Sequence, residues 1–104
     1  MVIYTDKLIP KRFAGYTIGP VILIRPSYRD DGPLLVHEKV HVKQFWRNPL
    51  APFLMNFKKY RQRYEVEAYK AQIEAGADLV KCSVLLAENY KLNITYQKAI
   101  QLLS

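Results

Sequence analysis

The chain has 104 residues, of which about half are hydrophobic, and a formal net charge of +7. This length predicts one domain, residues 1–104, with one modest core, and the apolar content excludes a disordered chain. The positive charge favours an acidic partner, either nucleic acid or an anionic surface, although the same charge would serve solubility alone.

The N-terminal residues, MVIYTDKLIPKRF, have no apolar stretch behind a basic start, and we therefore expect no signal peptide. The longest apolar run, Pro49–Met55, is too short for a transmembrane segment. The single cysteine, Cys82, excludes an intramolecular disulfide framework and suits a reducing compartment. These features predict a cytoplasmic protein, with Cys82 buried in an apolar helix.

The first thirty residues have the composition of short strands. Met1–Tyr4 is β-prone, and Tyr16–Ile18 and Val21–Arg25 flank a Gly19-Pro20 break. The continuous apolar run after this break predicts a buried strand or one pressed against a helix. We therefore expect a short N-terminal antiparallel β segment.

Helical patterns follow the strands. Asp30 or Asp31 and Pro33 are typical of a helix start, and Asn48-Pro49 is typical of a helix end. The segment that follows could be a loop with a short helix. The predicted helices are about Pro33–Arg47, Tyr64–Ala75, Asp78–Tyr90 and Thr95–Leu103. Strands first and three to four helices after predict an α+β domain.

The first predicted helix carries the only two histidines, His37 and His41, in the motif HEKVH. Residues four apart lie on one face of a helix, so both imidazoles can reach one metal ion. Glu38 lies about 100° further around the helix, where it suits a general base better than a ligand. The competing interpretation is a helix whose histidines merely pack, but a helix this apolar would leave both rings in need of partners.

A hydrolytic zinc site usually has three protein ligands and one open position. No histidine remains, so the third ligand must be a carboxylate or Cys82. Glu65 and Glu67 lie about 200° apart on the second predicted helix, so only one can face the metal. Glu65 shares a less charged face with Ala68, which favours Glu65 and leaves Glu67 as the alternative. The other downstream acidic candidates are Glu74, Asp78 and Glu88.

HEKVH followed by EVEAY resembles the gluzincins, the zincin metallopeptidases with a glutamate ligand, over about residues 21–72. The resemblance implies a minimal zincin-like domain in which Zn²⁺ is held by His37, His41 and Glu65, with Glu38 as the catalytic base. It places Tyr69 where the family often has an aspartate that orients a zinc-bound histidine, and it implies a weaker hydrogen bond there.

The gluzincin resemblance also implies a substrate-binding strand. In zincins an edge strand precedes the active helix and pairs with an extended peptide, and Val21–Arg25 occupies that place in the chain order. The oxyanion donor stays open among four nearby residues, which are Tyr60, Arg61, Arg63 and Tyr64.

The predicted function is a zinc-dependent metallopeptidase, a hydrolase acting on a peptide or protein substrate. One alternative is a catalytically inactive zincin-like binding module for nucleic acid or another acidic partner, and another is a basic DNA-binding module without metal. Glu38 favours the first, because a structural zinc has no use for a base. The segment FWRNPLAPFLMNFKKYRQR could contact a membrane surface or nucleic acid, but we favour a connector whose aromatic side chains complete the core.

Overall fold

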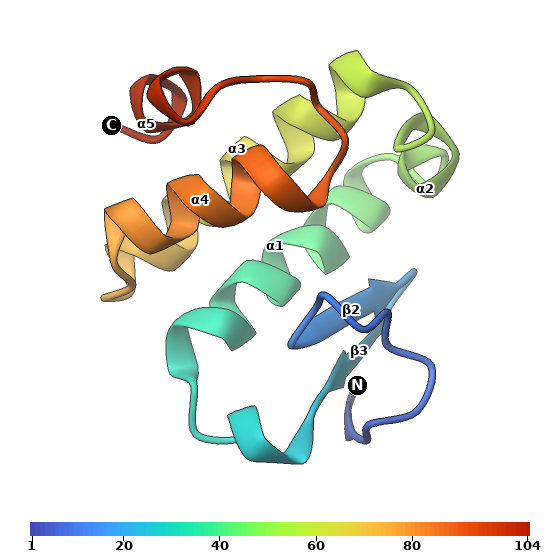
Figure 1. The fold of residues 1–104 in the computed structure, drawn as a ribbon. Coiled ribbons are helices and arrows are strands. Elements are labelled where there is room, and N and C mark those ends of the chain that lie inside the picture. Colours follow the sequence, from blue (N-terminus) through green and yellow to red (C-terminus); the bar gives the residue numbers. More distant parts are fainter.

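Three short strands precede five α-helices in the computed structural model, which describes residues 1–104 (Figure 1). The strands are β1 (Val2–Tyr4), β2 (Gly15–Ile18) and β3 (Val21–Ile24), and a short 3-10 helix, η1 (Pro26–Tyr28), follows them. The α-helices are α1 (Gly32–Arg47), α2 (Ala51–Leu54), α3 (Lys58–Glu74), α4 (Leu79–Asn89) and α5 (Tyr96–Leu103). This order confirms the predicted α+β class.

The strands form one mixed sheet in the order β1-β3-β2. β2 pairs antiparallel with β3, and Ile18 faces Val21 across a two-residue turn in which Gly19 has a φ of +58°. A positive φ at the first turn position suits glycine, so the predicted Gly19-Pro20 break is a hairpin turn. β1 adds a parallel pairing with β3, which the sequence pattern did not predict.

The prediction that Val21–Arg25 is the edge strand is wrong. β3 lies in the centre of the sheet, with β1 on one side and β2 on the other. The apolar run of β3 explains this position, since Ile22, Leu23 and Ile24 are all buried, as a central strand covered by a helix requires. β2 is therefore the edge strand next to the hairpin turn.

Helix α1 lies between the sheet and the other long helices (Figure 1). The side chain of Asp31 caps its first turn by accepting a hydrogen bond from the backbone N–H of Leu34 over 2.9 Å, and Pro33 occupies the same turn. The helix ends at Asn48, before Pro49, as predicted. This central position gives α1 one face toward β2 and another toward α3.

Helix α3 begins at Lys58, six residues before the predicted start at Tyr64. Phe57 occupies the N-cap position without a side-chain hydrogen bond, so no capping residue marked this start in the sequence. The first turns of α3 are instead stabilised by packing of the helix against α1 and by hydrogen bonds from Arg61 to distant carbonyl groups.

The main apolar core lies among α3, α4 and α5. Asp78 and Thr95 cap α4 and α5 through hydrogen bonds to the backbone N–H groups of Lys81 and Lys98. Cys82 is buried in this core, as predicted. None of the helices has the length and apolar character needed to cross a membrane. The buried core residues are Tyr69, Cys82, Leu86, Leu92, Ala99 and Leu103.

Candidate metal centre

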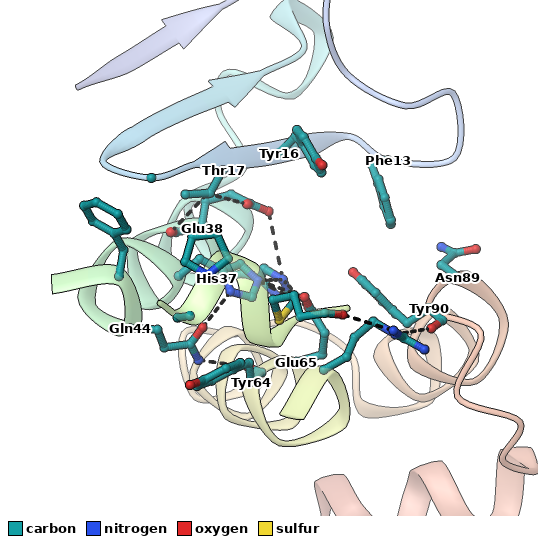
Figure 2. Close-up of a pocket in the computed structure, with 18 of the residues that line it drawn as sticks. Phe13, Tyr16, Thr17, His37, Glu38, Gln44, Tyr64, Glu65, Asn89 and Tyr90 are labelled. Atoms are coloured by element: carbon teal, nitrogen blue, oxygen red, sulfur yellow. Dashed lines mark hydrogen bonds and ion pairs between the residues drawn. The ribbon is translucent and has the colours of Figure 1, made fainter. Parts of the chain in front are cut away.

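Helices α1 and α3 bring His37, His41 and Glu65 together. Figure 2 labels His37 and Glu65 of this cluster. The Nε2 atoms of the two histidines are 3.2 Å apart. The Oε1 atom of Glu65 lies 3.2 Å from Nε2 of His37, and its carboxylate also lies 3.2 Å from Nε2 of His41. The helical spacing of HEKVH aims both rings at one point, and the close approach of α3 brings the carboxylate to the same point.

The three distances match those that a tetrahedral zinc site requires. Nitrogen and oxygen ligands about 2.0–2.1 Å from a tetrahedral ion lie about 3.3 Å from one another. Two imidazoles and one carboxylate are also a ligand set that zinc accepts at catalytic sites. The three side chains could therefore hold a metal ion without rearrangement of the helices.

The cluster is buried, and its charges compensate one another. His37 and Glu65 are each only 3% exposed. Burial disfavours the charged form of His41, but the Glu65 carboxylate outweighs burial and raises the pKa of His41 to about 9. Burial likewise disfavours the Glu65 carboxylate, but the charge of His41 and hydrogen bonds from both histidines lower the pKa of Glu65 to about 2. Glu65 is therefore an anion at neutral pH, as a metal ligand must be.

Glu67, the alternative third ligand, lies away from the two histidine Nε2 atoms. Its carboxylate accepts hydrogen bonds from Arg47 over 2.8 Å and from the side-chain amide of Gln44 over 3.0 Å. It is exposed, and the two glutamates point in different directions as their spacing on α3 predicted. The structure therefore brings Glu65, and not Glu67, to the cluster.

Glu38 lies beside the cluster and is held from the sheet side (Figure 2). Its Oε2 atom is 3.9 Å from Nε2 of His37, and its Oε1 atom accepts a hydrogen bond from the hydroxyl of Thr17 over 2.8 Å. A Cβ atom at Gly15 would lie 3.3 Å from Cγ and Oε2 of Glu38, so this strand position leaves little room for a side chain. The carboxylate is therefore positioned by β2 as well as by α1.

Gln44 is a site residue that the sequence reasoning missed. Its side-chain amide donates to the backbone carbonyl of Tyr64 and to Glu67, which turns its Oε1 atom toward Nδ1 of His41 at 2.8 Å. Nδ1 of His41 is thus the donor, and Nε2 is the atom that faces the cluster. The sequence did contain one indication of this role. Gln44 lies three residues after His41, so its polar side chain lies on the same face of the buried helix.

Tyr69 does not form the hydrogen bond that the gluzincin resemblance implied. Its ring packs edge-on against the ring of His37, with centroids 4.4 Å apart, and its hydroxyl lies 2.9 Å from the hydroxyl of Tyr90. Nδ1 of His37 is buried and has no hydrogen-bond partner. The expectation fails because the Tyr69 hydroxyl pairs with Tyr90, so only the ring of Tyr69 contacts His37.

The cluster opens into a cleft of about 450 Å³. Figure 2 shows Phe13 and Tyr16 on the strand side of this cleft, with Asn89 and Tyr90 beside Phe13. The rings of Phe13 and Tyr90 stack with centroids 5.4 Å apart, so the two residues close one end of the cleft. Among the four candidate oxyanion donors, Arg61 and Tyr64 line the cleft, whereas Tyr60 and Arg63 do not. Phe13, Tyr16, Asn89 and Tyr90 come from distant parts of the chain, so no local motif marked them as lining residues.

Known proteins show no likeness to this chain: no protein family, no curated protein and no solved structure matches it.

Proposed function

We propose that this chain is a zinc-dependent metallopeptidase. The observation that carries the proposal is the convergence of Nε2 of His37, Nε2 of His41 and the Glu65 carboxylate at 3.2 Å, with the Glu38 carboxylate beside them. A purely structural zinc site usually has four protein ligands, whereas this cluster offers three and faces a cleft. Three ligands beside a carboxylate that is not itself a ligand are what metal-assisted hydrolysis needs.

In this proposal the protein residues divide the work of hydrolysis. A zinc ion in the cluster would supply positive charge that acidifies a water molecule and polarises the carbonyl group of the substrate. Glu38 accepts a proton from that water as the water oxygen bonds to the carbonyl carbon. When the C–N bond breaks, Glu38 returns the proton to the departing amine. Thr17 holds the Glu38 carboxylate during both transfers.

The edge of β2 offers a place for the substrate backbone. β2 has a partner on one side only, and its residues Gly15, Tyr16 and Thr17 line the cleft. An extended peptide that pairs with this edge would pass the cluster of His37, His41 and Glu65, and the carbonyl groups of the peptide would be exposed to the cluster. This assigns to β2 the role that the resemblance had implied for Val21–Arg25.

The experiment compares wild-type protein with Glu38→Gln, which keeps the shape of the side chain and removes the base. Both proteins are reconstituted with zinc, assayed for metal content and incubated with a peptide library. We expect equal zinc content, and cleavage by the wild type alone. Equal cleavage by both would show that Glu38 is not the base, whereas zinc binding without cleavage by either would favour a binding module.

A further inference from the structure

The whole net charge of the chain lies in one segment, Lys39–Tyr64, here called the basic connector. It holds seven of the sixteen Lys and Arg residues and none of the nine Asp and Glu residues. The remainder of the chain therefore carries nine basic and nine acidic residues and is neutral overall. Such segregation gives one part of the molecule an attraction for anions that the rest lacks.

The basic connector also exposes large apolar side chains. Trp46 and Leu50 are each 66% exposed, Phe53 is 61% exposed and Phe57 is 51% exposed. They lie where the chain passes from the end of α1 through α2 to the start of α3 (Figure 1). The prediction that the aromatic side chains of this segment complete the core is therefore wrong for Trp46, Phe53 and Phe57.

Most cationic side chains of the basic connector are exposed and unpaired, so they are available to bind an anionic partner. Lys39, Lys43, Lys58, Lys59 and Arg63 are exposed and form no ion pair. Arg47, by contrast, is paired with Glu67, and Arg61 donates to three backbone carbonyl groups.

The free cations lie next to the exposed apolar residues. Lys39, Lys43 and Trp46 follow one another at spacings of four and three, so they share a face of α1. Lys58 and Lys59 directly follow Phe57 in the sequence.

We propose that the basic connector docks on the surface of an anionic lipid bilayer. Tryptophan and phenylalanine favour the depth of the lipid headgroups, and lysines beside them favour anionic headgroups. The exposed Leu50 argues for lipid over nucleic acid, because an aliphatic side chain gains from contact with acyl chains and cannot stack on a base. This inference does not depend on the metallopeptidase proposal.

Trp46 makes the test direct, because it is the only tryptophan in the chain. The full-length protein is titrated with phosphatidylcholine vesicles that contain or lack phosphatidylserine. We expect a blue shift of the Trp46 emission and co-sedimentation with the anionic vesicles only, weakened by added salt. No shift and no co-sedimentation at low salt would overturn the proposal.

Two double variants test whether vesicle binding depends on the basic connector or only on the total charge of the chain. Lys58→Glu with Lys59→Glu should weaken vesicle binding by roughly tenfold or more. Lys81→Glu with Lys98→Glu changes the net charge equally on α4 and α5, where both residues are exposed, and should leave most of the binding intact. Equal loss in the two double variants would show that only the total charge matters and would overturn the docking site.

Phe53→Ser tests the apolar part and should reduce the Trp46 blue shift, with an unchanged circular dichroism spectrum because Phe53 is exposed. Two results would reassign the surface and overturn the proposal. One is binding of a single-stranded oligonucleotide in the absence of vesicle binding. The other is a concentration-dependent dimer, seen by light scattering, that vesicles do not dissociate.

Discussion

The hydroxyl of Thr17 donates a 2.8 Å hydrogen bond to Oε1 of Glu38 and so ties edge strand β2 to the carboxylate beside the cluster of His37, His41 and Glu65. The other carboxylate oxygen, Oε2, then faces Nε2 of His37 at 3.9 Å. One strand thus both borders the cleft and orients the proposed base. Such an arrangement couples the place where a substrate backbone would pair to the group that would move the proton.

Replacing Thr17 tests this coupling. Thr17→Val keeps the shape of the side chain but removes the donor, and a hydrogen bond to a charged group is worth about 1.5–3 kcal/mol. We expect kcat/KM for peptide cleavage to fall by roughly tenfold or more while the zinc content stays the same. Thr17→Ser keeps the hydroxyl and is the matched control. Equal activity in the valine and serine variants would refute a role for this hydrogen bond.

Gln44 should support zinc binding through His41. Its Oε1 atom accepts from Nδ1 of His41 over 2.8 Å, and loss of such a partner typically costs 10–100-fold in metal affinity. Gln44→Ala should therefore raise the zinc Kd by about that factor in a chelator competition assay. The control is Gln101→Ala at an exposed position on α5, which should leave the Kd unchanged. An unchanged Kd for Gln44→Ala would mean that the ring of His41 needs no support.

Much of the fold and cluster could be predicted because the signals are local. The spacing of His37 and His41 determines that both rings share a helix face, and the helical phase of Glu65 and Glu67 separates their directions. Caps and breaks such as Asp31 and Asn48-Pro49 likewise mark helix ends within a few residues.

The missed features depend on contacts between distant segments. β1 pairs with β3 in parallel although residues 5–20 separate the two strands in the sequence. No residue of either strand encodes the direction of this pairing. The hydrogen bond of Thr17 to Glu38 likewise links residues 21 apart on different elements. The hydroxyl of Tyr69 likewise pairs with that of Tyr90, 21 residues further along the chain, and not with His37.

The two glutamates of α3 should differ in their effect on zinc binding. Glu65→Gln keeps the size of the side chain but removes the charge that faces both histidines, and should weaken zinc binding by more than about 100-fold. Glu67→Gln disturbs an exposed pair with Arg47 and should change zinc binding only a few-fold. Isothermal titration of both variants measures the difference, and a larger loss for Glu67→Gln would move the third ligand to that residue.

The charge pairing of His41 with Glu65 predicts how zinc binding depends on pH. Burial alone would lower the pKa of His41, but the Glu65 carboxylate raises it to about 9, so metal-free His41 is protonated at neutral pH. Zinc needs the deprotonated Nε2 atom, so a proton must leave, and zinc affinity should rise as pH increases toward 9. The pKa of Glu65, lowered to about 2, keeps that carboxylate ionised throughout this range.

Nuclear magnetic resonance titration of metal-free protein measures this pKa at the His41 ring. We expect a midpoint near 9 instead of the ordinary 6.5. Glu65→Gln is the control, because it removes the carboxylate and leaves the His41 ring buried. The midpoint should then fall below the ordinary value, because burial lowers the pKa and the main charge that raises it is gone. A midpoint near 6.5 that does not respond to Glu65→Gln would show that the carboxylate and the imidazole are not paired in solution.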